Sequence, residues 1–238
     1  MSKTYRQYDS RWAKLSYPPD SKYTMSGSGC GPTACAELIV NNPKYEKVTP
    51  KHTRKFMINN DYATNGHGTK WDGIPACLKH YGFKAKRVTD MATLWDEMEK
   101  PGRRCILLFR GGTRGGITWT ASGHYVAASS YRKTGSKHYL YTRDPGVRNN
   151  DGWHCYEDTM KGLIKAVWVC WLPEFEVGKT YTLQYKMNVR KGASTRCKKV
   201  TTLKKGTKVK CIDVSNDGEW IECSEGWIRG IGKKVYIK

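Results

Sequence analysis

The sequence predicts an α+β domain followed by a small all-β barrel. Helical patterns occupy most of the chain before Pro101, and short runs of β-branched and aromatic residues follow it. From residue 178 onward the strands become shorter and glycine turns recur about every ten residues, which is typical of a small barrel. A chain of 238 residues is long enough for one well-cored domain and a small second one. We therefore expect domains at 1–173 and 178–238.

Helical spacing is found in four stretches before Pro101. Helices are expected after the glycine-rich stretch 26–31 and within 50–60, 69–88 and 92–100. In the third of these, apolar residues recur at helical spacing and Gly82 is placed to end the helix.

The strand patterns after Pro101 fall into two groups. The first group is rich in β-branched and aromatic residues and predicts an antiparallel sheet from 104–110, 124–131, 138–144 and 166–172. The second group has closely spaced glycine turns and predicts the barrel from 179–192, 198–214, 219–223 and 226–230.

The charge of the chain is strongly positive and favours polyanionic partners. The formal net charge is +21, and residues 178–238 contain fifteen Lys or Arg against five Asp or Glu. Such a field attracts nucleic acid, anionic lipid or the anionic polymers of a bacterial envelope. Charge alone does not choose among these three classes of partner.

No pattern in the sequence predicts a membrane span, a metal site or a cofactor. The first residues lack the apolar core of a signal peptide, and no segment approaches the roughly 18 apolar residues of a membrane span. The chain is therefore expected to be made in a cytoplasm. The nine cysteines include no CxxC pair and no Cys/His cluster at zinc spacing, so most are expected to be small buried hydrophobes.

One cysteine, Cys30, lies in a context that differs from the others. It follows the small residues of "SGSGCGPTACAELIV" and precedes an apolar helical pattern. A thiol at a helix N-terminus is more easily ionised, and the N–H groups there are able to stabilise an oxyanion. Gly27, Gly29 and Gly31 are expected to let the backbone turn tightly. A thiol buried at a packed helix start is the alternative. Cys35, one turn deeper in the same predicted helix, is interpreted as a core residue.

A nucleophilic thiol needs a histidine, and His124 is the best placed of the six. It opens a predicted strand after a glycine, and the next strand ends in Asp144. If the turn between these strands is centred near Thr134, paired residue numbers sum to about 268 and His124 faces Asp144. A carboxylate at that position orients an imidazole. Cys30, His124 and Asp144 thus form a candidate catalytic set.

Three motifs resemble those of the papain-clan cysteine peptidases of family thirty-nine. They are "GCGPTACAELI", "GHYVAA" and "RDPG", and the resemblance extends over most of 5–172. It implies a papain-like cysteine peptidase domain in which Cys30 is the nucleophile, His124 the general base and acid, and Asp144 the orienting residue. It also implies that Gln7, in "RQYD", assists the oxyanion hole. Papain-like enzymes usually place that glutamine a few residues before the cysteine, where this chain has Thr24.

The basic tail resembles the bacterial Src-homology-3-like wall-binding domains. The resemblance rests on "MNVRKG", "GEWIEC" and "GWIRG". A cysteine peptidase joined to such a barrel is similar to a phage endolysin, which implies cleavage of an amide bond in peptidoglycan, with peptidoglycan and anionic wall polymers as partners. Synthesis in the host cytoplasm and action at the wall after release are expected. Three alternatives remain: an N-acetylmuramoyl-L-alanine amidase, a protein-processing protease, and a non-enzymatic binder of nucleic acid.

Overall fold

The chain divides into two compact units. The computed structural model describes residues 4–40, 42–215, 218–232 and 235–238. The first unit comprises the residues up to Met98 and Arg103–Trp171, and the second comprises Glu99–Gly102 and the residues from Leu172 onward. The turn 99–102 thus belongs to the second unit, whereas the sequence division places it in the first. Lys100 explains this assignment, because its amine pairs with the buried carboxylate of Glu219.

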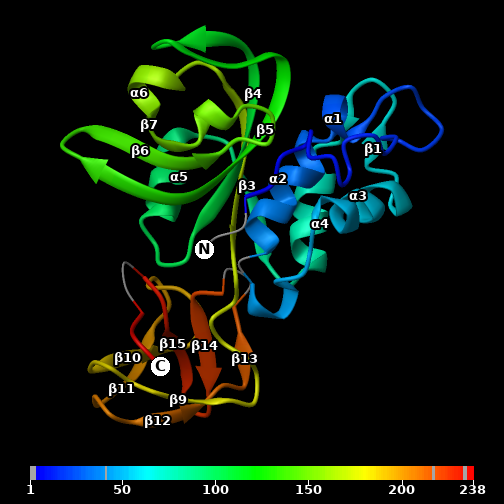
Figure 1. Ribbon diagram of the computed structural model, residues 1–238. Helices are drawn as coiled ribbons and strands as arrows, with labels where there is room; N and C mark the ends of the chain where they lie inside the picture. The colour runs from blue at the N-terminus through cyan, green and yellow to red at the C-terminus, as the bar shows by residue number, and fades with distance from the viewer. Residues whose placement is uncertain (1–3, 41, 216–217, 233–234) are drawn as a thin grey trace. The chain divides into compact units, whose positions relative to one another are not determined.

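The first unit contains the helices and a six-stranded antiparallel sheet (Figure 1). Its helices are α1 (Met25–Ser28), α2 (Cys30–Ile39), α3 (Pro50–Asn59), α4 (Gly73–His80), α5 (Met91–Met98) and α6 (Tyr156–Thr159), with 3-10 turns η1 (Pro43–Tyr45) and η2 (Arg148–Asn150). Its strands are β1 (Ala63–Thr64), β2 (Gly68–Thr69), β3 (Lys84–Val88), β4 (Arg104–Arg114), β5 (Ile117–Thr134), β6 (Lys137–Arg143), β7 (Gly152–Cys155) and β8 (Ile164–Trp171). The large sheet has the order β3-β8-β4-β5-β6-β7, and β1 and β2 pair separately.

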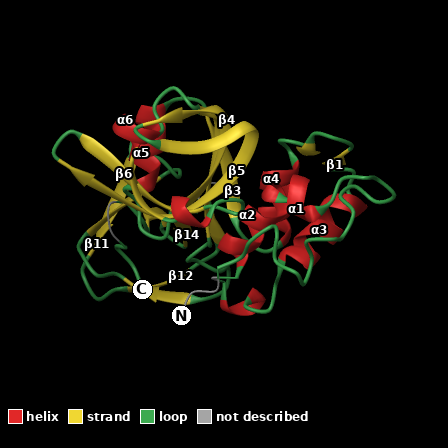
Figure 2. Ribbon diagram, turned by 45° about the horizontal axis from the view of Figure 1, so that its top comes forward, coloured by secondary structure: helices red, strands yellow, loops and turns green. Residues whose placement is uncertain are grey.

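The central strands of the large sheet are buried on both faces. In β4, Cys105, Leu107 and Phe109 join a cluster with Leu94 of α5, whereas α2 lies against β5 and α4 lies against β8. Figures 1 and 2 show α1–α4 gathered on one side of this sheet, away from α5 and α6. Burial on two faces explains why β4 and β8 are nearly continuous apolar runs in the sequence.

Most of the predicted helices and strands are confirmed. The helices expected within 50–60, 69–88 and 92–100 are α3, α4 and α5. Gly82 follows α4 with a φ of +82°, a left-handed conformation that glycine adopts without strain. The four strands expected after Pro101 are β4, β5, β6 and β8.

Strand β3 was not predicted. It lies at the edge of the sheet, and only Val88 of its five residues is buried. Its sequence, KAKRV, therefore lacks the alternation of apolar and polar residues that reveals a half-buried strand. The prediction that the sheet begins only after Pro101 is wrong for this strand.

The second unit is a small all-β structure. Its strands are β9 (Thr180–Thr182), β10 (Met187–Arg190), β11 (Lys199–Leu203), β12 (Lys208–Lys210), β13 (Asp213–Val214), β14 (Trp220–Cys223) and β15 (Gly226–Arg229). Five of them form the sheet β11-β10-β15-β14-β13, and β12 pairs with β9. A separate apolar cluster, which includes Val189, Ile221 and Ile228, fills its interior. This unit thus has its own core, as the sequence predicts for the barrel.

None of the described helices combines the length and apolar character that crossing a membrane requires.

Candidate active site

Cys30 is the first residue of helix α2 and is partly exposed. Gly29 is the N-cap of this helix and has a φ of −89°, and none of Gly27, Gly29 and Gly31 has a positive φ. The three glycines therefore do not use the left-handed backbone conformation that favours glycine.

Close packing explains why two of these three positions are glycine. A Cβ atom on Gly31 would lie 2.3 Å from the Thr69 Oγ1 atom, and a Cβ atom on Gly29 would lie 2.5 Å from the main-chain oxygen of Met25. Helix α2 therefore approaches β2 more closely than a side chain at position 31 allows. This close approach places the thiol beside the residues of the β1–β2 region.

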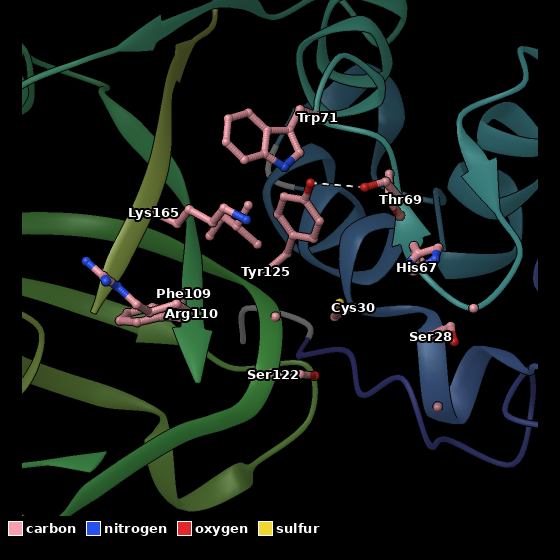
Figure 3. Close-up of a pocket in the computed structure, with 15 residues that line it drawn as sticks. Ser28, Cys30, His67, Thr69, Trp71, Phe109, Arg110, Ser122, Tyr125 and Lys165 are labelled. Carbon is pink, nitrogen blue, oxygen red and sulfur yellow. Dashed lines mark hydrogen bonds between the residues drawn. The ribbon is translucent and has the colours of Figure 1, made fainter. Parts of the chain in front are cut away.

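A cleft of about 470 Å³ opens at Cys30. Its walls include Trp71 and Tyr125, and its described lining contains Arg110 and Lys165 but no carboxylate. Figure 3 shows Lys165 extending toward Trp71 and Tyr125, while the guanidinium of Arg110 points away from Cys30. The Lys165 amine lies 5.5 Å from the centre of the Trp71 ring. We call this space the active-site cleft, and its charge favours a substrate with a negative group.

The side chains of His124 and Asp144 are in direct contact, and His124 interacts with the Cys30 thiol. The His124 Nε2 atom lies 2.6 Å from the Asp144 Oδ1 atom, and the Asp144 side chain is fully buried. Because Nε2 is engaged by the carboxylate, Nδ1 is the ring nitrogen that remains for the Cys30 thiol, with which His124 interacts. The three residues predicted from the sequence are thus together in one site.

The strand register differs from the predicted one. Ala127 pairs with Arg143 and Thr134 pairs with Lys137, so paired numbers sum to 270 or 271 instead of about 268. The sum is 271 from the turn to Ser130 and 270 at Ala128 and Ala127, so the irregularity between Ala128 and Ser130 reduces the offset by one residue. Asp144 lies just beyond the end of β6 and reaches His124 from the following loop, so the two residues are neighbours without being a cross-strand pair.

The loop after β6 holds the Asp144 carboxylate in place. Its Oδ1 atom accepts hydrogen bonds from the N–H groups of Gly146 at 2.8 Å and Val147 at 3.0 Å. Its Oδ2 atom accepts one from the Asn150 side-chain amide at 2.9 Å. A Cβ atom on Gly146 would lie 3.1 Å from the His124 Cε1 atom, so a glycine at this position leaves room for the imidazole.

The electrostatics of the site favour an ionised thiol. Burial raises the pKa of Cys30, but the hydrogen bond and charge of His124, together with the N–H groups of Tyr125 and Gly31, outweigh burial and lower it below its ordinary value. Burial lowers the pKa of His124, whereas Asp144 and Cys30 raise it, and the net direction is upward. In contrast, burial raises the pKa of Cys35, in the same helix, well above its ordinary value. The site therefore favours the thiolate form of Cys30 and the imidazolium form of His124.

Gln7 lies next to this site. Its main-chain N–H group donates to the carbonyl of Pro145 at 2.9 Å, and its side-chain amide donates to the carbonyl of Ser26. Pro145 follows Asp144, and Ser26 precedes Cys30 on α1, so Gln7 contacts both catalytic segments. Its role in an oxyanion hole stays a prediction.

Sequence reasoning missed Asn150 and the residues of the cleft. Asn150 is buried and donates to Asp144 and to the carbonyl of Thr118 at 3.2 Å. Its sequence context, "VRNND", is that of a polar loop and carries no signal of this contact. Across the described residues, no cluster of three or more His, Cys, Asp or Glu side chains is suited to bind a metal ion.

The fold and the site together define a papain-like cysteine peptidase. The profile of the Peptidase C39-like family matches residues 4–171, and the chain belongs to this family. The profile of the bacterial SH3 domain matches residues 186–230. The fusion of these two domains was predicted from the sequence and is confirmed.

The solved structures that match the chain are distant in sequence. The peptidase domain of Streptococcus ComA, a bifunctional ABC transporter involved in quorum sensing, is 18% identical, with a TM-score of 0.44, over 61% of this chain and 92% of that one. Ly7917 is 16% identical, with a TM-score of 0.25, over 79% of this chain and 86% of that one. No curated protein matches the chain.

Proposed function

We propose that this protein is a peptidoglycan hydrolase of the phage endolysin type that cleaves an amide bond in the stem peptide or cross-bridge. The observation that carries the proposal is the contact of Cys30, His124 and Asp144 beside a cleft whose described lining has cations and no carboxylate. Wall peptides carry free carboxylates, and such a cleft attracts them. A peptidase domain joined to a bacterial SH3 domain fits an enzyme that acts on a bacterial wall.

The proposed reaction has an acylation step and a hydrolysis step. The Cys30 thiolate attacks the amide carbonyl carbon, and the N–H group of Cys30 and the Gln7 side chain stabilise the oxyanion. The His124 imidazolium then gives its proton to the leaving nitrogen as the C–N bond breaks, which leaves a thioester on Cys30. A water molecule passes a proton to His124 and attacks the thioester, which frees the acid and restores the thiolate and imidazolium.

The place of action belongs to the same proposal. We infer synthesis in the cytoplasm of a Gram-positive host and action at the wall after release. The positive charge of the chain favours retention on anionic wall polymers.

Replacement of the nucleophile tests the proposal. Cys30→Ala should abolish lysis of Gram-positive cell walls and leave wall binding intact, because only the thiol is removed. Cys197→Ala is the matched control, since Cys197 is the other partly exposed thiol, and it should lyse walls like the unmodified protein. Full lytic activity in Cys30→Ala would contradict the proposal.

Mass spectrometry of the digested wall identifies the bond that is cut. An endopeptidase produces new peptide termini within the stem peptide or cross-bridge. An N-acetylmuramoyl-L-alanine amidase frees intact stem peptides from the sugar by the same thiol chemistry. Turnover of casein without any wall lysis would instead favour a protein-processing protease.

A further inference from the structure

An ion pair between Arg6 of the N-terminal segment and Asp151 of the loop after β6 hydrogen-bonds the main chain of Asp144. The Arg6 guanidinium donates to the main-chain carbonyl of Asp144. The same guanidinium binds both carboxylate oxygens of Asp151, with the Nη1 atom 3.1 Å from Oδ1. In turn, the Asp151 Oδ1 atom accepts the main-chain N–H group of Asp144 at 2.8 Å. One ion pair thus satisfies both main-chain polar groups of the residue whose side chain holds His124.

We propose that the Arg6–Asp151 pair positions Asp144, and through Asp144 and His124 maintains the reactive form of Cys30. The inference rests on the catalytic roles proposed above for these three residues. Arg6 and Asp151 are positioning residues, because neither contacts the thiol. The pair fixes the main chain, and the N–H groups of Gly146 and Val147 and the Asn150 amide fix the carboxylate.

Burial and surroundings make this pair different from a surface ion pair. The side chains of Arg6 and Asp151 are only 13% and 17% exposed. The Arg143 Nη1 atom lies 3.9 Å from the Asp151 Oδ2 atom, and its Nε atom lies 4.0 Å from the buried carboxylate of Glu37. Removing one partner of such a network leaves an uncompensated charge, so the loop is expected to rearrange.

The chain positions of the partners explain why a long-range contact is needed. Arg6 is 138 residues away from Asp144, and Asp144 lies beyond the last ladder pair of β6. Past that point the sheet no longer defines the path of the loop. The N–H group of Gln7 donates to the carbonyl of Pro145, so the N-terminal segment also holds the residue after Asp144.

The test is the pH dependence of Cys30 alkylation in the full-length protein carrying Asp151→Asn or Arg6→Lys. Iodoacetamide is the probe, and mass spectrometry of the Cys30 peptide separates this thiol from the other eight. Asp151→Asn keeps an oxygen that accepts the Asp144 N–H group but removes the charge. Arg6→Lys keeps the charge but loses the planar fork that binds three oxygens at once.

Both variants should move the midpoint of the Cys30 alkylation profile upward, toward that of a free thiol, by about one pH unit. The rate of wall lysis should fall roughly ten- to a hundredfold, because small displacements of a catalytic group have effects of that size. Arg11→Gln and Asp9→Asn are matched controls in the same segment, where the two side chains are 60% and 26% exposed, and they should leave the alkylation profile unchanged.

An unchanged alkylation profile in folded Asp151→Asn and Arg6→Lys would overturn the inference, even if lysis fell, because the pair would then be only structural. Loss of the fold in both variants, seen by circular dichroism, would overturn it as well. The probe needs no substrate, so the outcome is independent of the peptidoglycan proposal. A shifted profile in a protein that never lyses walls would contradict that proposal alone.

Discussion

His124 is held in one orientation, and this determines which ring nitrogen faces the Cys30 thiol. Asp144 takes the Nε2 atom, so the Nδ1 atom is left for the thiol of Cys30. The buried carboxylate also favours the charged form of the ring, because it places a negative charge 2.6 Å from the ring nitrogen. In the proposed mechanism, the reactive state is therefore an ion pair between Cys30 and His124.

The activity should depend on pH in a window set by this ion pair. Because the pKa of Cys30 is lowered, the thiolate forms at a lower pH than an ordinary thiol does. Because the pKa of His124 is raised to about 10, the imidazolium is lost only as the pH rises through that value. Wall lysis and Cys30 alkylation should both rise below the ordinary thiol range, and lysis should decline toward pH 10. The measurement is the rate of wall lysis and the rate of Cys30 alkylation as the pH is raised to about 10.

Asp144→Asn tests the cause of the upper limit. Removing the carboxylate should lower the pKa of His124, so the decline of lysis should move to lower pH. An alkaline limit unchanged in Asp144→Asn would contradict the assignment.

The same pKa shifts make the stability of the fold depend on pH. The contribution of His124 to folding stability is fully present below its unfolded pKa of 6.5 and is lost as the pH rises through its raised pKa in the folded protein. Asp144, with a lowered pKa, stabilises the fold above 3.8 and loses this effect in acid.

The candidate catalytic residues were predictable one by one, but their supporting residues were not. Cys30 is marked by its glycines and by the helix that follows it, and His124 and Asp144 by the ends of predicted strands. Asn150, Arg6 and Asp151 carry no such local signal. Each acts on Asp144 only because the loop after β6 brings them together.

At the scale of elements, the packing of α2 against β2 positions the Cys30 thiol. Gly31 packs against Thr69, whose hydroxyl lies 2.8 Å from the Tyr17 hydroxyl. The Thr69 carbonyl accepts a hydrogen bond from the Tyr125 hydroxyl at 3.1 Å (Figure 3). Thr69 is thus held by two tyrosines and is unable to move aside easily. The glycine before and the glycine after Cys30 therefore serve the contact of α2 with its neighbours.

Gly31→Ala should destabilise the protein and reduce its activity. The added Cβ atom would lie 2.3 Å from the Thr69 Oγ1 atom, and overpacking of this kind costs about 1–3 kcal/mol. Unfolding in denaturant measures the free energy of unfolding, and Cys30 alkylation measures the displacement of the thiol. Gly27→Ala is the matched control, since no atom lies within 4 Å of its added Cβ, and it should change stability by no more than about 0.5 kcal/mol. Equal stability of the two variants would contradict this role of Gly31.

The register of the β5–β6 hairpin was predictable only approximately. The sequence marks the two strands and the turn, but the irregularity between Ala128 and Ser130 has no visible signal. At Ala127 and Ala128 the shift is two residues, which preserves the face to which each strand side chain points. Asp144 lies beyond β6, so its contact with His124 depends on the path of the following loop and not on the strand register.

At the scale of the whole molecule, positive charge is present in both units and is dense in the second. Residues 178–238 hold fifteen Lys or Arg against five Asp or Glu. The second unit has its own core and its own family match. We propose that the second unit binds the wall. Its contribution to wall retention is separable from the contribution of net charge.

A charge-matched pair of variants separates these two contributions. Lys208→Glu with Lys210→Glu changes two exposed residues of β12, and Lys133→Glu with Lys161→Glu makes the same charge change in the first unit. The first pair should weaken wall retention by about tenfold or more, and the second pair should have a much smaller effect. Sedimentation with purified walls at several salt concentrations is the measurement, made in the Cys30→Ala background. Equal weakening by both pairs would assign retention to net charge alone.

Sequence patterns were enough to predict the α+β class, the second all-β unit, and Cys30, His124 and Asp144 as candidate site residues. These features depend on local periodicity, glycine placement and short motifs, all of which are local properties of the sequence. The edge strand β3, the packing reason for Gly31, and the contacts of Arg6 and Asp151 with Asp144 became known from the folded structure. These depend on contacts between residues far apart in sequence, and the chain reveals such contacts only when packing has brought them together.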